Sequence, residues 1–565
     1  MKKFTFLAAL ALATSMSAYS QDQVTTTLPE WTDEITTVDS LAEYVRTAPI
    51  ALDDNLNTIV AGRYKREESL QFGLYNFNTV TVNDAFIGKY DKKGLRQWVA
   101  GINGNAVFTA VATDEEGNIY AAGKFGAEAN VLGTDGQFKT ITDGDAESTS
   151  RKSAFLAKYD KDGVLLDVKT FTAQIDESLM PAGGDYFSIA EADVTVNQIQ
   201  VDGGKVYLSI AHKGKVNLAD DTLEGNYCTL YYCMFDALTT VDIIYLNATN
   251  LSESAWVASL SAEEQVVEEA QYQPESVCFT VDNGVVYAGF SGQGRLVLQS
   301  ADVKKICDFD YSLYGDGIEH GFLFARITDT GAVSTREYGS YATTNESSFN
   351  YVDCMKMVDG KLCVAGTFNV EGLFSGLEYK GGCDTYMLVL DPGSLEITYA
   401  QSSQVDEGDA KYNAEVVTGM FSAAGSIYVT GYAETTADHK FTSPITYKMD
   451  LSNGVMEPVK DVEAYITSVA QNGNYIASVA ADGIKYVIDF CDGVTAGIDD
   501  VDAGSESIVR NGDTVTLSSP ANISVYSADG ALAASAKSAT SISLAGLSHG
   551  VYVVKAGQKT VKVTK

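Results

Sequence analysis

Basic residues are scarce in this chain. Its 565 residues include 39 Lys and Arg against 75 Asp and Glu, which gives a formal net charge of −36. Nucleic acids and anionic lipid surfaces are bound through positive charge, so this balance disfavours both as partners. The same acidity favours solubility and permits cation binding, but an acidic composition by itself defines no cation site.

Histidine and the common catalytic motifs are scarce as well. The four histidines are His212, His320, His439 and His549, and none lies near a second His or a Cys pair at metal-ligand spacing. The sequence has no G-x-S-x-G elbow, no H-E-x-x-H, no phosphate loop and no S-x-D-x-G-x-T-W box. We therefore predict no catalytic, cofactor-binding or metal-binding residue, while a carboxylate pair for glycoside hydrolysis stays open.

Two short acidic segments are compatible with Ca²⁺. Asp160-Lys161-Asp162-Gly163 and Asp143-Gly144-Asp145 place oxygen ligands at alternate positions, as Ca²⁺ loops do. Neither continues into a twelve-residue loop that ends in a bidentate Glu, and the first also has the form of a tight turn. We predict turns here and no cofactor, with Ca²⁺ as the alternative.

Long apolar runs are absent after residue 20, so no transmembrane segment is expected in the mature chain. Residues 1–20 are typical of a signal peptide: Lys2 and Lys3 precede an apolar core (4–13) and a small-residue cleavage site (18–20). This segment has no Cys, which disfavours a lipoprotein anchor; a short membrane anchor is the alternative. Cleavage removes the two lysines, so the formal net charge of the mature chain is −36 − 2 = −38. We expect an extracellular or outer-membrane surface location, with the periplasm as the alternative.

Proline is rare, with 8 residues, whereas Tyr (32) and Phe (23) are abundant. This composition indicates a well-packed β protein and excludes a disordered one. The apolar runs are short, rich in Val, Ile, Tyr and Phe, and bounded by turn residues, which is typical of β-strands.

A pair of short motifs recurs seven times in the same order. The first is an apolar strand that ends in a small residue and Gly: NTIVAGRY (57–64), NIYAAGKF (118–125), KVYLSIAH (205–212), VVYAGFSG (285–292), KLCVAGTF (361–368), SIYVTGYA (426–433) and NYIASVAA (474–481), the third and the last being degenerate. The second is an aromatic-apolar strand that runs into a turn: DAFIGKYDKKG (84–94), SAFLAKYDKDG (153–163), TLYYCMFDALT (229–239), FLFARITDTG (322–331), TYMLVLDPG (385–393), ITYKMDLSNG (445–454) and KYVIDFCDG (485–493). The repeat period of roughly 60 to 80 residues exceeds that of solenoids and indicates propeller blades of about four strands.

These residues resemble the bacterial seven-bladed β-propeller repeat family, in which D-x-F-V-x-K-x-D-x-x-G is followed by D-x-x-G-N-x-Y-x-x-G. The copies at 84–94 and 114–123 match well. The resemblance implies an all-β fold with a seven-bladed β-propeller over residues 51–495; six or eight blades are the alternatives. The N-terminal segment 21–50 is predicted to supply a ring-closing strand near 31–38. The glycine of the A-G motif suits a close approach near the axis or a bulge.

The remaining chain is predicted to form a linker (496–510) and a small C-terminal antiparallel β-sandwich (511–565). The segment 523–530, followed by Leu544, Leu547 and Gly550-Val551-Tyr552, resembles the C-terminal sorting domain of the Bacteroidetes type IX secretion system. This resemblance implies passage through the outer membrane by contact with the secretion machinery. A related sandwich without a sorting role is the alternative.

The eight cysteines lie between residues 228 and 491. We predict buried structural thiols, with at least one disulfide as the alternative in view of the export signal. Cys228 and Cys233 would face opposite sides of a strand, which disfavours a bridge between them. Two stretches depart from the repeat: residues 174–197 are predicted to form a long loop, and residues 250–276 a short helix on one rim.

The leading functional hypothesis is a secreted or cell-surface binding protein of a Bacteroidetes-type bacterium, whose ligand is a glycan or a protein. We place the site at the mouth of the central channel or on the rim with residues 250–276, because ligand sites favour concavities. The alternatives are a carbohydrate-active hydrolase or lyase with carboxylates at the channel mouth, and an adhesin or surface-layer component. Three or more acidic or Tyr side chains that converge in a closed pocket would favour the enzyme.

Overall fold

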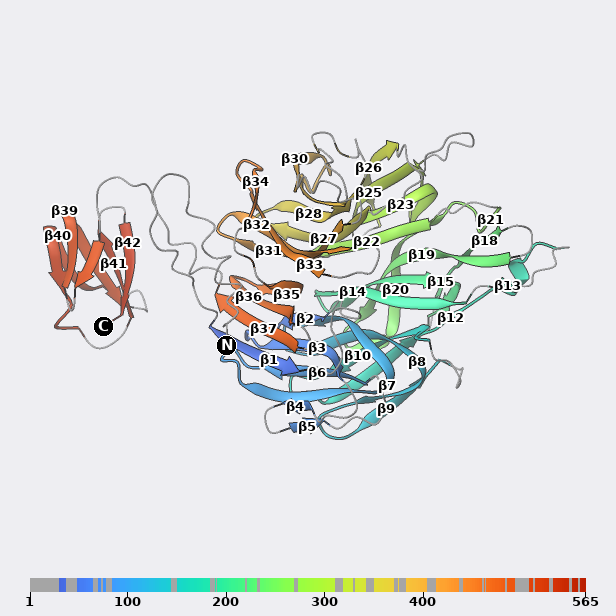
Figure 1. Cartoon of the computed structure of the whole chain (residues 1–565), viewed down its shortest axis with the longest axis horizontal. Helices are drawn as coiled ribbons and strands as arrows, with labels where there is room; N and C mark the ends of the chain where they lie inside the picture. The colour runs from blue at the N-terminus through green and yellow to red at the C-terminus, as the bar shows by residue number, and fades with distance from the viewer. Residues whose placement is uncertain are drawn as a thin grey trace. The chain divides into compact units, whose positions relative to one another are not determined.

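The structure is a computed structural model of the chain (Figure 1). It describes residues 30–36, 48–64, 70–72, 75–77, 84–143, 150–182, 188–189, 191–218, 221–230, 234–268, 273–309, 319–328, 331–341, 350–369, 374, 377, 383–403, 413–435, 441–459, 462, 464–482, 485–492, 508–511, 514–527, 532–547, 551–556 and 559–564. These fall into two compact units, one that ends at residue 493 and one that begins after it. The predicted signal peptide and most of the predicted linker lie outside the described residues.

The first unit is built from four-stranded antiparallel groups. In chain order they are β2 (Ile50–Leu52), β3 (Thr58–Tyr64), β6 (Asp84–Tyr90) and the start of β7 (Arg96–Thr113); the end of β7 with β8 (Ile119–Leu132), β10 (Ser153–Tyr159) and β11 (Leu165–Phe171); β14 (Asp193–Asp202), β15 (Lys205–Lys213), β19 (Met234–Asn247) and β20 (Asn250–Ala262); β22 (Gln273–Asp282), β23 (Val285–Ser300), β25 (Glu319–Ile327) and β26 (Val333–Tyr341); β27 (Tyr351–Val358), β28 (Lys361–Phe368), β29 (Asp384–Leu390) and β30 (Ile397–Ser402); β31 (Asn413–Ala423), β32 (Ser426–Thr435), β33 (Phe441–Asp450) and β34 (Met456–Pro458); and β35 (Tyr465–Asn472), β36 (Tyr475–Asp482), β37 (Lys485–Asp492) and β1 (Trp31–Thr36).

Smaller elements extend these groups. They are the hairpin β4 (Leu70–Phe72) and β5 (Tyr75–Phe77); β9 (Phe138–Thr142) beside β8; the sheet of β12 (Ala173–Gln174), β16 (Lys215–Asn217) and β17 (Thr222–Leu223); β13 (Ser188–Ile189) and β18 (Asn226–Leu230) beside β19; β21 (Val266–Glu268) beside β18; β24 (Lys304–Phe309) beside β23; and a 3-10 helix, η2 (Glu177–Leu179).

The innermost strands close into a ring. β2 packs against β7, β7 against β14 and β14 against β22, and the order continues through β27, β31 and β35, which packs against β2. In Figure 1 the colour follows this order from blue β2 through green β22 to orange β35, which lies beside β2. The predicted all-β propeller fold is therefore confirmed, and the number of seven blades stays a prediction from the repeat.

A strand from the N-terminal segment completes the last group of the ring. β1 pairs antiparallel with β37, with Trp31 opposite Phe490. The Trp31 ring stacks on Tyr90 and Phe490 with centroid distances of 5.2 and 5.6 Å. Arg96 Nε donates a hydrogen bond to Asp33 Oδ2 at 2.6 Å. Because β37 would otherwise be an open edge, β1 covers it and ties the last group to the first.

The glycine of the A-G motif permits a close approach between the two innermost strands of a group. A Cβ atom at Gly366 would lie 1.9 Å from the carbonyl oxygen of Tyr351, and one at Gly431 would lie 1.9 Å from that of Val416. No side chain fits such a distance, so these positions require glycine.

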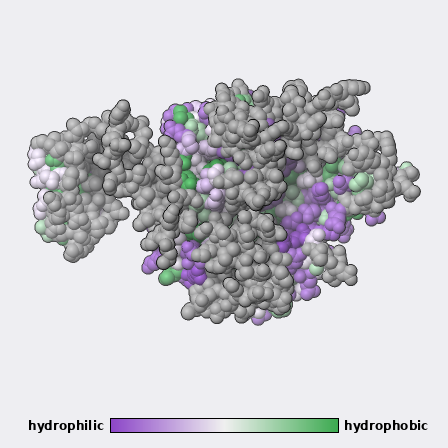
Figure 2. All heavy atoms as spheres, in the orientation of Figure 1, coloured by the Kyte–Doolittle hydropathy of each residue, from purple (hydrophilic) through white to green (hydrophobic). Residues whose placement is uncertain are grey.

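The helix predicted within residues 250–276 is wrong. β20 pairs with β19 and, through its last residues, with β23. Ala258, Leu260 and Ala262 of β20 are buried at every second position, which is the period of a strand. Ser252 and Glu253 at its other end are exposed, and Figure 2 shows hydrophilic residues over β12 and β20. Within the helix-forming run 261–270, Val266–Glu268 form β21, which pairs with β18. The open edges of β19 and β18 outweigh the helix-forming composition of this stretch.

The loop predicted for residues 174–197 is only partly a loop. It contains η2, β13 and the first residues of β14. Asp176 caps η2, because its carboxylate accepts a hydrogen bond from the backbone N–H of Ser178. No helix with the length and hydropathy of a membrane span occurs in the described part of the chain.

The second unit is a small antiparallel β-sandwich. It contains β38 (Ile508–Asn511), β39 (Thr514–Ser527), β40 (Leu532–Ser543), β41 (Val551–Ala556) and β42 (Lys559–Thr564), in the order β38-β39-β41-β42 with β40 also paired to β39. The register between β39 and β40 shifts at several points, so the sheet can fold over one core. This core includes Val515, Ile523, Val525, Leu544 and Val554.

Candidate functional site

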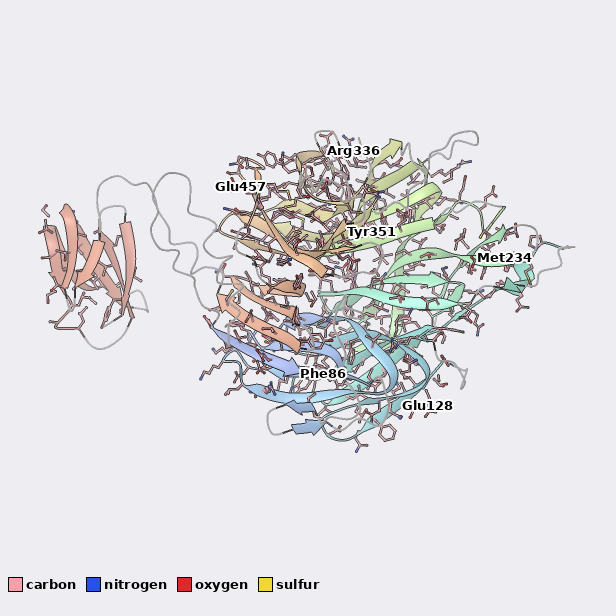
Figure 3. All side chains as sticks on the ribbon, viewed as in Figure 1. Phe86, Glu128, Met234, Arg336, Tyr351 and Glu457 are labelled. Carbon is pink, nitrogen blue, oxygen red and sulfur yellow. The ribbon has the colours of Figure 1, made fainter. Side chains whose placement is uncertain are left out.

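The inner strands enclose a cavity of about 390 Å³ at the centre of the ring. Its wall comes from residues of β2, β7, β14, β22, β27, β31 and β35, together with Pro49, which directly precedes β2. Figure 3 labels Tyr351, the first residue of β27, near the middle of the propeller. The volume is within the range of small-ligand sites, about 300–1,000 Å³.

Six of the inner strands share a β-bulge, whereas β2 pairs with β3 without a register shift. In the described chain the bulged residues are Thr109 in β7, Asn197 in β14, Glu275 in β22, Asp353 in β27, Thr418 in β31 and Thr467 in β35. All of them are polar, and all except Glu275 line the cavity. A bulge leaves its extra residue outside the ladder and re-aims the side chain. The repeat therefore places a ring of polar side chains around the channel.

Several polar groups of this ring serve the fold. Thr109 Oγ1 donates to the carbonyl of Val196 at 2.6 Å, and Thr418 Oγ1 donates to that of Ile466 at 2.6 Å. Each bond joins one inner strand to the next. The Gln198 amide makes a similar junction, because it donates to Phe279 O at 2.7 Å and accepts from Phe279 N at 3.1 Å.

Asp353 is less completely bonded than these residues. Its Oδ2 accepts a hydrogen bond from Thr367 Oγ1 at a long distance of 3.4 Å. Burial raises the pKa of Asp353 to about 7, and the Thr367 hydroxyl opposes this shift. The carboxyl group therefore exchanges its proton near neutral pH.

Lys356 lies on the same strand and also lines the cavity. Its Nζ donates to Gln471 Oε1 at 2.5 Å, and the same oxygen accepts the backbone N–H of Ser422 at 2.9 Å. Burial lowers the pKa of Lys356 to about 8. No ion pair joins Lys356 to Asp353, so the two charged groups of the described cavity wall stay separate.

Two thiols complete the polar part of the wall. Cys278 and Cys354 line the cavity, and burial raises the pKa of Cys278 to about 12 and that of Cys354 well above its usual value. Thiols in this state are weak nucleophiles at neutral pH. None of the cysteines in the described part of the chain forms a disulfide, and Cys233 lies outside that part.

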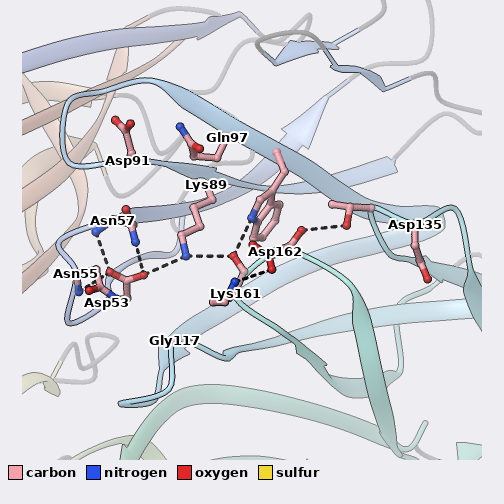
Figure 4. Close-up of a pocket in the computed structure, with 12 residues that line it drawn as sticks. Asp53, Asn55, Asn57, Lys89, Asp91, Gln97, Gly117, Asp135, Lys161 and Asp162 are labelled. Atoms are coloured by element: carbon pink, nitrogen blue, oxygen red, sulfur yellow. Dashed lines mark hydrogen bonds and ion pairs between the residues drawn. The ribbon is translucent and has the colours of Figure 1, made fainter.

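A second cavity, of about 530 Å³, lies among the turns at the ends of β2, β6, β8 and β10 (Figure 4). It is lined by four aspartates, but each is occupied. Asp53 accepts from Asn55 N and Asn57 N at 2.9 and 2.8 Å and pairs with Lys89 Nζ at 3.1 Å. The other three are Asp91 and Asp135, which bind backbone N–H groups of their own turns, and Asp162, which pairs with Lys161.

The other candidates from the sequence also have structural partners. His212 is buried, with Nε2 2.8 Å from Asp242 Oδ2 and Nδ1 2.6 Å from Gly214 O. Asp160 Oδ1 accepts the backbone N–H of Asp162 and of Val164, both at 2.9 Å, as expected for a tight turn.

No group of three potential metal ligands is found among the residues that the structure describes. Asp143 Oδ2 accepts the backbone N–H of Ala127 at 2.8 Å. The remaining candidates, which are the side chain of His320 and the residues His439, His549 and Asp145, lie outside the described part.

Neither Asp353 nor Lys356 was expected from the sequence. Both charged residues stand within an otherwise apolar strand, YVDCMKMV, directly before an Asp-Gly turn. A charge inside an otherwise apolar inner strand is the signal that could have pointed to them.

Comparison with known proteins gave no match to a family model and none to a curated relative. Among solved structures, the chain is similar to the Cps50 (Swd1) β-propeller domain of Myceliophteria thermophila, at 8% identity and a TM-score of 0.37 over 81% of this chain and 98% of that one. It is similar to Sqt1 of Saccharomyces cerevisiae at 8% identity and a TM-score of 0.34, over 81% and 99%. A virginiamycin B lyase of Staphylococcus aureus follows at 11% identity and a TM-score of 0.25, over 68% and 96%.

Proposed function

We propose that this chain is an exported β-propeller that binds a glycan or protein ligand at its central channel. The observation that carries the proposal is the channel wall, where a bulge in successive strands turns polar side chains toward a cavity of about 390 Å³. Bulges next to sites are a common means of aiming side chains at a ligand.

The same wall favours binding over hydrolysis. Asp353 is the one carboxylate among its described residues, and no Tyr lines it. Glycoside hydrolysis needs a second carboxyl group across the scissile bond. In the turn cavity four carboxylates are present, but each is bound within its own turn or to a lysine.

Export is supported by the sequence: the signal peptide of residues 1–20 and the likeness of residues 511–565 to a type IX sorting domain. Together they favour a secreted or surface-attached protein of a Bacteroidetes-type bacterium. Deletion of residues 511–565 should then retain the protein in the periplasm. Unchanged secretion of the shortened chain would refute the sorting role.

The binding role is tested with the full mature chain on arrays of glycans and host proteins. We expect a saturable hit that weakens when the channel wall is altered by Asn197→Ala, because Asn197 is an exposed member of the bulge ring. Asn453→Ala, in an exposed turn outside the channel, is the matched control. Turnover of the hit by the protein would overturn the role as a binding protein only.

A further inference from the structure

Asp353 is a carboxylate in the channel without a cationic partner. Its single described hydrogen bond is the long one from Thr367, and Lys356 is turned to Gln471. The titratable groups around it are Cys278, Cys354 and Tyr386, and burial raises the pKa of each, which keeps them neutral. Asp353 is half-buried, and a carboxylate that is partly removed from water without a cationic partner is costly to ionise, so the site gains most from a ligand that brings a positive charge.

The rest of the wall determines the shape of that ligand. Val111, Ile199, Val417, Val469 and Met420 line the cavity, and no aromatic side chain belongs to its described lining. Apolar walls favour an alkyl chain. A sugar ring would find no stacking platform here, and an anion would be repelled by the ionised form of Asp353.

A metal ion fits the channel less well than an organic cation. Hard cations take six or more oxygen ligands, whereas this wall offers one carboxylate and no cluster of three potential ligands in the described chain. An ammonium group needs fewer partners, because one carboxylate and a few hydroxyl or carbonyl oxygens satisfy its three N–H donors.

We propose that the channel binds an alkylammonium group, with its ammonium on Asp353 and its alkyl chain against the apolar wall. This inference rests on the proposed binding at the central channel and, of the two ligand classes proposed above, favours a protein over a glycan. The group could belong to a free primary amine or to a lysine side chain of a protein. The net charge of −36 attracts either toward the molecule.

Lys356 is the internal check on this proposal. As the one cation of the described wall, it repels an incoming ammonium, and its hydrogen bond to Gln471 holds it away from Asp353. Replacement of the two charges should therefore act in opposite directions: Asp353→Asn should weaken amine binding and Lys356→Met should strengthen it.

The experiment measures binding of butylamine to the full chain by titration calorimetry at pH 8, with butanol and butyrate as ligands of matched size. We expect butylamine alone to bind, with affinity reduced about 10- to 100-fold by Asp353→Asn, the loss of a charge-assisted hydrogen bond. Lys356→Met should raise the affinity about 2- to 5-fold. Asp167→Asn, a carboxylate outside the channel that pairs with Lys139, should leave it unchanged.

Nα-acetyl-lysine methylamide distinguishes the two sources of the amine. Tighter binding of this ligand than of butylamine indicates a protein lysine, and weaker binding indicates a free amine; both support the site. Equal binding of butylamine and butanol, which needs no variant, would overturn the proposal. So would equal affinity in Asp353→Asn, or no binding of either amine. Array hits that persist in these cases would leave the general binding function intact.

Discussion

Two cavities of this propeller contain the same residue types in different states. In the turn cavity, Asp53 and Lys89 pair at 3.1 Å and are almost fully buried. In the channel, Asp353 and Lys356 stand three residues apart on one strand and do not pair. The first pair belongs to repeat positions, where Asp and Lys stabilise turns and strand ends. The two channel residues lie on β27, which has a bulge at Asp353 and lines the central cavity. The state of a charged residue in this repeat protein therefore depends less on its residue type than on whether the fold provides it with a partner.

The strongest test of this comparison is Lys89→Met, which leaves Asp53 buried without its partner. We expect a loss of about 3–5 kcal/mol in the free energy of unfolding, measured by urea denaturation. Lys139→Met removes one partner of an exposed pair with Asp167 and should cost less than about 1 kcal/mol. Similar losses in the two variants would mean that the turn cavity does not hold a structural ion pair.

The second test is the pH dependence of stability in Asp353→Asn. The pKa of Asp353 is raised to about 7 in the folded chain and is about 3.9 in an unfolded one. The folded state therefore binds the proton more tightly, and its contribution is fully present below about pH 4 and lost as the pH rises to about 7.

Asp353→Asn should remove this loss, so the variant gains stability relative to the original chain between pH 4 and 7, by at most about 4 kcal/mol. Thermal unfolding across this range measures the difference. Burial raises the pKa of Asp489 to about 6. Because Asp489 is present in both chains, its contribution to the pH dependence cancels in the difference. A difference that does not vary with pH would show that Asp353 is solvated like a surface carboxylate.

The smallest expected effect concerns Thr418, a residue of the bulge ring whose hydroxyl, unlike the carboxylate of Asp353, has a structural partner. Thr418→Val removes the bond from Thr418 Oγ1 to Ile466 O and should cost about 1 kcal/mol, as a buried hydrogen bond does. Thr140→Val, which removes an exposed bond to Asn130, is the control and should change the unfolding free energy by less than about 0.5 kcal/mol. No difference between the two would remove the assigned structural role of Thr418.

The repeat made the strands, turns and propeller fold predictable from the sequence. Asp160 binds its own turn, and Gly366 and Gly431 stand where a side chain would meet a carbonyl oxygen. These features depend on local sequence, and they can be recognised because the same motifs recur seven times. The error in residues 250–276 had a tertiary cause, since composition favours a helix there but β19 and β18 offer edges to which β20 and β21 pair.

The channel site was not predictable by the same reasoning. A bulge is defined by the pairing of two strands, and nothing in YVDCMKMV alone shows that Asp353 stands outside the ladder between Val352 and Cys354. The lack of a partner for Asp353 depends further on Lys356 turning to Gln471, a residue 115 positions away. Such properties follow from the closed ring and not from any single copy of the repeat.

The strand that closes the ring sets an order of events in folding. Thr32 and Asp489 share a hydrogen bond across 457 positions of the chain, so the earliest part of the propeller to be synthesised must wait for nearly the last. Local groups such as β27 to β30 can pair as soon as they emerge, but closure carries the entropy cost of the longest loop. Until then the face of Trp31 that later stacks on Phe490 stays exposed. A nascent chain of this protein is therefore an open arc with one uncovered end, and only the finished chain is a ring.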